Sequence, residues 1–215
     1  ERVAELAATG RRVLLLGRSP AALQGQELPA QMTPAALVTL TEQVRPDAQE
    51  TLQYFADQGV SIKVISGDNP TTVAAIARRV GLDVPPEALV DARTIGEDPE
   101  ELREIVERTT VFGRVSPEQK RALVQALQRN GHVAAMTGDG VNDALALKDA
   151  DIGVAMGNGA QATKAVAQLV LLDGRFSHLP SVLAEGRRMI GNVERVANLF
   201  VAKNVMSLIA IITAA

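Results

Sequence analysis

The feature that most limits the possible folds is a unit of strand, polar turn and helix that occurs more than once. A strand is predicted at residues 60–65, followed by the turn Ser66-Gly67-Asp68 and a helix that begins at Pro70 and ends before Gly81. A second strand, expected at residues 133–136, runs into the turn Thr137-Gly138-Asp139-Gly140. Strands that alternate with helices predict an α/β fold with a parallel sheet and helices on both faces. Ligands of such sheets bind at the carboxyl ends of the strands, so both turns are expected at the site.

The composition excludes several other classes of protein. With 22 Lys and Arg, 25 Asp and Glu, a net charge of −3 and 47% hydrophobic residues, the chain is too apolar to be disordered. An acidic balance and only 2% aromatic residues argue against a nucleic-acid partner. The absence of cysteine excludes a disulfide framework, a thiolate metal site and a cysteine nucleophile. The two histidines, His132 and His178, are isolated and predict no site.

The hexamer Gly138-Asp139-Gly140-Val141-Asn142-Asp143 carries the clearest chemical signal. Its glycines allow a sharp turn, while Asp139 and Asp143 supply hard oxygen ligands and Asn142 a neutral amide. An Asp-Gly turn is also a common way to end a strand, so Gly-Asp-Gly alone predicts no site. Two carboxylates clustered at a strand end need compensating positive charge, however. We therefore expect a Mg²⁺ site formed by Asp139 and Asp143.

Two further segments contain groups suited to binding phosphate. The Ser66 hydroxyl and the N–H groups at the following helix start form a suitable seat for an anion, although a simple helix cap explains this turn equally well. Lys120 lies in the first turn of a helix expected at residues 118–128 and capped by Ser116. Such a lysine is usually solvated, but this position also lets it point toward a phosphate at the edge of the sheet.

Both ends of the chain are expected to be cut. The sequence opens without an initiating Met in a helix predicted at residues 2–7, so upstream sequence is expected to be missing. From Leu199 to Ala215 the chain is apolar except for Lys203, Asn204, Ser207 and Thr213. This segment is either a buried terminal helix or the first half of a membrane helix, since after Lys203 it covers only about 18 Å of a core of roughly 30 Å. The basic residues before it suit a cytoplasmic approach to a membrane: Arg187, Arg188, Arg195 and Lys203.

These motifs together resemble those of a known family. Residues 136–157 are similar to the hinge signature of the P-type cation-transporting ATPases. Ser66-Gly67-Asp68 resembles the family's Thr-Gly-Asp turn, residues 114–120 resemble its lysine motif, and Val44-Arg45-Pro46-Asp47 resembles the point of re-entry into its phosphorylation domain. From Glu185 onward the chain is similar to the stalk that enters the fifth membrane helix, so the resemblance covers essentially the whole chain.

The resemblance implies catalytic and metal-binding roles for three of these residues. Asp139 would bind Mg²⁺, and Asp143 would hold the site together, either as a second ligand or through a contact beside the metal. Lys120 would neutralise the negative charge that develops on the phosphoryl group. Catalysis of this kind is electrostatic, because the cations stabilise charge that spreads during an in-line displacement.

The resemblance also implies a phosphate-binding set. Ser66 and the Gly67 amide would hold phosphoryl oxygens together with Lys120, and Asn142 would donate to the same group. Asp68 belongs to the same phosphate-binding set and would face the junction with the nucleotide-binding domain.

The implied domain organisation has three parts. Residues 1–36 would be the C-terminal part of a nucleotide-binding domain, residues 37–184 a phosphorylation domain of the haloacid-dehalogenase type, and residues 185–215 a stalk with a truncated transmembrane helix. The family nucleophile lies in an Asp-Lys-Thr-Gly-Thr motif, which does not occur in this sequence. Its strand would lie between the strand that ends at Ser66 and the one that ends at Thr137. The chain by itself is therefore expected to lack the middle of its sheet, to fold poorly and to hydrolyse no ATP.

Two positions depart from the family pattern. Glu42 and Gln43 stand where many members have Asp-Pro, and whether Glu42 keeps the role of that aspartate is left open. Leu145 replaces a proline common in the hinge signature, which removes rigidity but no ligand.

The resemblance implies that the chain is part of an ATP-driven ion pump that works through an aspartyl-phosphate. The resemblance implies Mg²⁺ as cofactor, ATP as substrate, a transported metal cation with Ca²⁺ slightly favoured, and a multi-pass membrane protein with residues 1 to about 197 on the cytoplasmic side. A soluble Mg²⁺-dependent phosphatase of the same superfamily is the alternative, and a regulatory nucleotide-binding module is a third reading. The basic, then apolar, C-terminal segment favours the pump.

Overall fold

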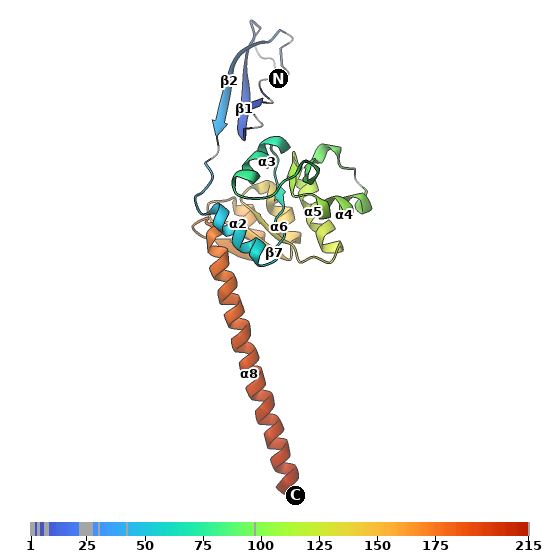
Figure 1. Cartoon of the computed structure of the whole chain (residues 1–215), viewed down its shortest axis with the longest axis vertical. Coiled ribbons are helices and arrows are strands. Elements are labelled where there is room, and N and C mark those ends of the chain that lie inside the picture. Colours follow the sequence, from blue (N-terminus) through green and yellow to red (C-terminus); the bar gives the residue numbers. More distant parts are fainter. Residues whose placement is uncertain are drawn as a thin grey trace. The chain divides into compact units, whose positions relative to one another are not determined.

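The computed structural model describes residues 3, 5–6, 9–21, 28–29, 31–41, 43–96 and 98–214 (Figure 1). Of the helix predicted at residues 2–7, residues 3, 5 and 6 are described and helical, whereas residues 2, 4 and 7 lie outside the described residues, as does Glu42. The chain separates into two compact units, Glu1–Arg175 and Phe176–Ala215, and each is described by itself.

The first described strands form an antiparallel hairpin. β1 (Arg11–Arg18) pairs with β2 (Thr33–Thr41), with a register shift between Leu16 and Gly17. Alternate residues of a strand point to opposite faces, and the consecutive residues Leu14, Leu15 and Leu16 are all exposed. Both faces of the hairpin are therefore apolar and uncovered within the described residues. The expected domain limit after residue 36 falls inside β2.

Two parallel three-stranded sheets follow the hairpin. In the first, β3 (Val64–Ile65), β5 (Val111–Gly113) and β4 (Leu89–Asp91) lie in that spatial order. In the second, β6 (Ala135–Gly138), β7 (Ile152–Met156) and β8 (Leu169–Leu171) lie in chain order. Both β3 and β6 are edge strands, each paired on one side only. The parallel α/β class predicted from the sequence is confirmed.

The predicted strand limits need correction at both edges. The strand expected at residues 60–65 is regular only at Val64–Ile65, because its ladder forms only opposite Val111 and Phe112 of β5. The strand expected at residues 133–136 is shifted to Ala135–Gly138, because its partner β7 begins opposite Ala135. Thr137 and Gly138 therefore belong to the strand and not to the turn.

Helices follow the strands as the alternating pattern predicts. Their bounds are α2 (Ala48–Asp57), α3 (Pro70–Arg79), α4 (Pro99–Arg108), α5 (Pro117–Arg129), α6 (Ala144–Asp149) and α7 (Gln161–Val166). Short 3₁₀ turns lie at Pro86–Ala88, Ala92–Thr94, Val141–Asp143 and Phe176–His178. Proline occupies the first turn of α3, α4 and α5, where no N–H partner is needed. Ser116 caps α5 in a reciprocal capping box with Gln119.

The core of the first sheet lies on both of its faces. On β5, Val111 packs in one cluster with Val73, Ala77 and other residues, so α3 covers that side. The next residue, Phe112, packs in a second cluster with side chains of α4 and α5: Ile105, Val106, Leu123 and Ala126. A third cluster joins α5 and α6 to the second sheet through Val124, Leu147, Met136 and Ala155. Helices therefore flank the sheet on both faces, and α5 connects the two sheets.

The second unit contains one long helix. α8 (Leu179–Ala214) has 36 residues and is continuous in Figure 1, which corresponds to about 54 Å of helix. It begins before Glu185, where the stalk was predicted to start. By length and composition it is long and apolar enough to cross a membrane, and the most apolar window has no buried residue.

Candidate functional site

The acidic loop after β6 is a tight turn built around a buried carboxylate. Asp143 is only 7% exposed, and its Oδ2 accepts the N–H of Gly140 at 3.1 Å. A Cβ atom on Gly138 would lie 2.6 Å from the Cβ of Asp143, so only glycine fits at the end of this strand. Asp139 and Asn142 lie on the exposed side of the same loop. The hexamer thus holds one acid inside and one acid at the surface.

Lys120 and Asp143 form an ion pair between two segments that are distant in sequence. The Nζ of Lys120 lies 2.6 Å from Oδ1 of Asp143, and the two side chains are 13% and 10% exposed. The Ser116 cap starts α5 just before Lys120, which directs this lysine toward the acidic loop. The structure therefore brings together the lysine and one of the two acids that the sequence singled out.

Asp139 differs from Asp143 in what its carboxylate touches. No hydrogen bond or ion pair engages the Asp139 carboxylate among the described residues, whereas both oxygens of Asp143 already have partners. The described residues contain no group of three or more acidic, histidine or cysteine side chains that would hold a metal by themselves. Mg²⁺ needs only one or two protein carboxylates, because water and phosphate oxygens complete its shell. The residues therefore fit Mg²⁺ with Asp139 as the free ligand and Asp143 as the group that fixes Lys120.

The Ser66 turn is held firmly at the carboxyl end of β3. The N–H of Ser66 donates to the carbonyl of Phe112 in β5 at 2.9 Å, and the Ser66 carbonyl accepts the N–H of Val115, in the segment after β5, at 3.0 Å. The Ser66 hydroxyl accepts the N–H of Asp68 at 3.1 Å and keeps its own proton to donate. Asn69, and not Asp68, caps α3, by accepting the N–H of Thr71 at 2.9 Å. Gly67 is exposed and has open space around it.

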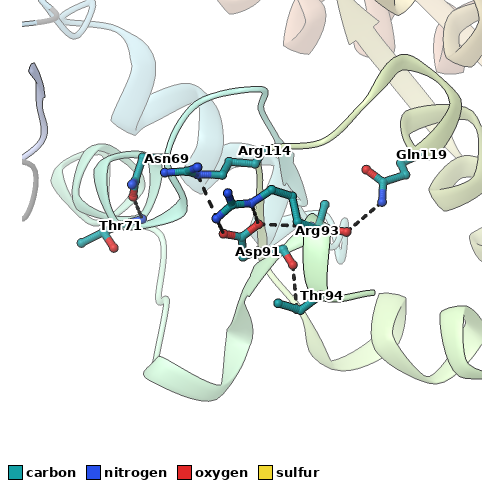
Figure 2. A network of polar contacts seen from close by, with 8 residues as sticks. Asn69, Thr71, Asp91, Arg93, Thr94, Arg114 and Gln119 are labelled. Atoms are coloured by element: carbon teal, nitrogen blue, oxygen red, sulfur yellow. Dashed lines mark hydrogen bonds and ion pairs between the residues drawn. The ribbon is translucent and has the colours of Figure 1, made fainter. Parts of the chain in front are cut away.

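Arg114 also holds this turn, although the sequence pattern predicts no role for it. It is the one described non-glycine residue with a positive φ, 54°, and its N–H donates to the Asp68 carbonyl at 2.8 Å. Figure 2 shows Arg93 and Arg114 directed toward the carboxylate of Asp91 at the end of β4, with distances of 2.7 Å and 3.8 Å. The hydrogen bonds from Arg93, helped by the charge of Arg114, lower the pKa of Asp91 to about 2. A motif shows that an arginine is present, but its left-handed backbone appears only in the structure.

The predicted residues therefore fall into two groups at the carboxyl ends of the strands. Lys120, Asp139, Asn142 and Asp143 gather at the end of β6, whereas Ser66, Gly67 and Asp68 gather at the end of β3. No hydrogen bond or ion pair joins the two groups within the described part of the chain. β3 and β6 are edge strands of two separate sheets.

Comparisons with known proteins identify the family of this chain. A family model described as haloacid dehalogenase-like hydrolase matches residues 2–151. A calcium-transporting ATPase CtpE of Mycolicibacterium smegmatis is 56% identical over 209 residues, which are 97% of this chain and 26% of that protein. The probable cation-transporting ATPase exp7 of Streptococcus pneumoniae is 43% identical over 94% of this chain and 26% of that protein. The human calcium-transporting ATPase type 2C member 1 is 40% identical over 89% of the chain and 20% of that protein.

A solved structure shows the same fold. The catalytic domain of the CPx-ATPase CopB-B superposes with a TM-score of 0.52 and 25% sequence identity, covering 71% of this chain and 50% of that one. The chain spans about a quarter of the length of the two bacterial relatives named above and about a fifth of the human one. The predicted resemblance to P-type cation-transporting ATPases is confirmed, and the chain belongs to the haloacid dehalogenase-like hydrolase family.

Proposed function

We propose that this chain is the phosphoryl-transfer part of an ATP-driven calcium pump. The observation that carries the proposal is the 2.6 Å ion pair between Lys120 and Asp143, which lies in the loop that also carries the free carboxylate of Asp139. A lysine fixed at the loop that carries a free acid, at the carboxyl end of a parallel strand, suits the stabilisation of a phosphoryl group. The relatives from Mycolicibacterium smegmatis and human are both named calcium-transporting ATPases, which supports Ca²⁺ as the cargo.

Each residue of the site has a role that its surroundings allow. Asp139 would hold Mg²⁺, which when bound neutralises phosphoryl oxygens as a Lewis acid. Lys120 is fixed by Asp143 and would add a second positive charge at the same group. Asn142 is exposed on the same loop and can donate its amide hydrogens.

At the end of β3, the exposed Gly67 amide and the Ser66 hydroxyl would hold the remaining phosphoryl oxygens. Asp68, whose carbonyl Arg114 holds, would face the nucleotide-binding domain. All these groups would be in position before the reaction begins, so they would need little reorganisation when negative charge spreads over the phosphoryl oxygens.

The covalent step would belong to an aspartate outside this chain. The γ-phosphorus of ATP would form a bond to that carboxylate as the bond to ADP breaks, and water would later hydrolyse the acyl-phosphate. The unpaired edges of β3 and β6 support this proposal, because a strand that pairs with both would close the gap between the two sheets.

The outer parts of the chain would link this centre to its neighbours. The β1–β2 hairpin exposes apolar residues on both faces, as expected of strands from a larger nucleotide-binding domain that continues outside the chain. α8 would serve as the stalk and enter the lipid bilayer near residue 197, which leaves residues 1 to about 197 on the cytoplasmic side. The three-part division at residues 36 and 184 stays a prediction.

The proposal is tested by transport and hydrolysis in the full-length protein. Inside-out vesicles should take up ⁴⁵Ca²⁺ only with Mg²⁺ and ATP, and a panel of cations should show the strongest stimulation of ATP hydrolysis by Ca²⁺. Asp139→Asn and Lys120→Met should each lower both activities at least 100-fold, while the exposed controls Asp83→Asn and Lys148→Met keep them. Hydrolysis of phosphate esters without stimulation by any cation would instead support a phosphatase and refute the pump.

A further inference from the structure

We infer that the β7–α7 loop, residues 157–160, positions the metal-binding carboxylate of Asp139. The N–H of Ala160 donates to the Asp139 carbonyl at 2.7 Å, although 21 residues separate the two positions in the chain. This inference rests on the proposed function, because it gives the loop a role only if Asp139 binds the metal. Gly159 and Ala160 are positioning residues in this account, since neither would touch the metal or the phosphate.

Gly159 lies directly against the backbone of Asp139. A Cβ atom at position 159 would lie 2.8 Å from the Asp139 carbonyl oxygen and 2.9 Å from its Cα, and 3.0 Å from the carbonyl oxygen of Met156. All three neighbours are backbone atoms, which cannot rotate away as a side chain can. Glycine is therefore required here by the close approach of the two loops, and any larger residue must displace Asp139 or the loop itself.

The loop is anchored on the side away from Asp139. The N–H of Gly157 donates to Leu171 of β8 at 2.7 Å, and Lys164 of α7 donates to the Gly157 carbonyl at 3.1 Å. The Thr163 hydroxyl is fully buried and donates to the Ala160 carbonyl at 2.7 Å. Because these contacts tie the loop to β8 and α7, a clash between residue 159 and Asp139 would displace mainly Asp139.

The backbone contact matters because Asp139 has no side-chain partner. Asp143 is held through both carboxylate oxygens, whereas the Asp139 carboxylate is engaged by no described residue. Its place in the site is therefore set by the backbone alone. A displacement of about 1 Å in such a site can lower a rate roughly 100-fold, so the loop would control both metal affinity and turnover.

The test measures metal binding and activity in the full-length protein. Mn²⁺ alone serves as the probe, and its binding is followed by the loss of the free Mn²⁺ signal in electron paramagnetic resonance. The site is defined as the portion of binding that Asp139→Asn abolishes, which separates it from any transport site. Gly159→Ala inserts the clashing atom, and Ala160→Pro removes the N–H at a φ of −62° that proline accepts. Ala160→Ser keeps the N–H and serves as the matched control, and Gly186→Ala adds a methyl group where there is open space.

The expected result is at least a tenfold rise in the dissociation constant for Mn²⁺ in Gly159→Ala and in Ala160→Pro, with both controls like the wild type. The Mg²⁺ concentration that gives half-maximal ATP hydrolysis should rise in parallel, while the KM for ATP at saturating Mg²⁺ stays within twofold. Unchanged Mn²⁺ affinity in two folded variants would overturn the inference. So would loss of cooperative unfolding in both, because the loop would then support the fold and not the carboxylate. If Asp139→Asn itself changes neither Mn²⁺ binding nor activity, the proposed function fails as well.

Discussion

The ion pair between Lys120 and Asp143 gives the most quantitative prediction. Its atoms are 2.6 Å apart and its side chains are 13% and 10% exposed, so removing one partner leaves a nearly buried charge without compensation. Breaking buried pairs costs about 3–5 kcal/mol, and the lower end applies to Lys120→Met because the Gly140 N–H still binds Asp143. We therefore expect Lys120→Met to lower the free energy of unfolding by about 3 kcal/mol.

A double variant measures the coupling free energy between Lys120 and Asp143 separately from their other contacts. Asp143→Asn should cost about 2 kcal/mol, and Lys120→Met with Asp143→Asn should cost less than the sum of the two by about 2 kcal/mol. The exposed pair of Arg103 and Glu100, whose side chains are 38% and 76% exposed, is the matched comparison and should show a coupling below about 0.5 kcal/mol.

Residues 1–215 contain no tryptophan, so unfolding of this part of the protein is followed by proteolysis and not by tryptophan fluorescence. Pulse proteolysis of the detergent-solubilised full-length protein reports the fraction of the domain that is unfolded at each urea concentration. A coupling free energy below 0.5 kcal/mol for Lys120 and Asp143 would refute the reasoning, because the two groups would then be solvated separately and the lysine would not be held at the site.

Three smaller predictions follow from other contacts. Ser116→Ala removes the capping box with Gln119 and should lower the free energy of unfolding by about 1 kcal/mol in the same assay, with an unchanged result refuting the cap. Because the pKa of Asp91 is lowered to about 2 in the folded state, its contribution is present above the unfolded value of about 4 and is lost as the pH falls toward 2. The melting temperatures of wild type and Asp91→Asn should therefore differ at pH 6 and converge near pH 2, and a constant difference would contradict this. Gly191→Pro should break α8 and lower Ca²⁺ uptake per ATP hydrolysed, with Gly191→Ala as control, and unchanged uptake per ATP would exclude α8 as the coupling element.

Local patterns predict the regular elements of this fold well. The prolines that begin α3 and α5 and the Ser116 cap of α5 give helix limits within one or two residues. These features are local, because a cap or a hydrophobic period depends on residues within one helical turn. The sequence analysis does not identify β4, β5 and α4. The signals were present in the Asp98-Pro99 start of α4 and in the β-branched residues before Gly113.

Properties that depend on pairing could not be predicted from local patterns. The strand predicted at residues 60–65 alternates apolar residues with Ser61 and Lys63 before Val64 and Ile65, but its regular part depends on how far β5 runs beside it. The sequence places Asp139 and Asp143 together as metal ligands, whereas the structure gives Asp143 two partners and leaves Asp139 free. Arg114 and Gly159 act through backbone geometry, which the identity of a residue does not reveal.

Mapping the phosphorylated residue in the full-length protein tests the central claim most directly. Brief exposure to [γ-³²P]ATP with Mg²⁺ and Ca²⁺ should give an acid-stable, hydroxylamine-sensitive acyl-phosphate. After proteolysis, the label should lie on an aspartate outside residues 1–215, and Asp139→Asn or Lys120→Met should slow its formation at least 100-fold. A label within residues 1–215, or one formed at the normal rate in both variants, would contradict the assignment of this chain as the site that serves an external nucleophile.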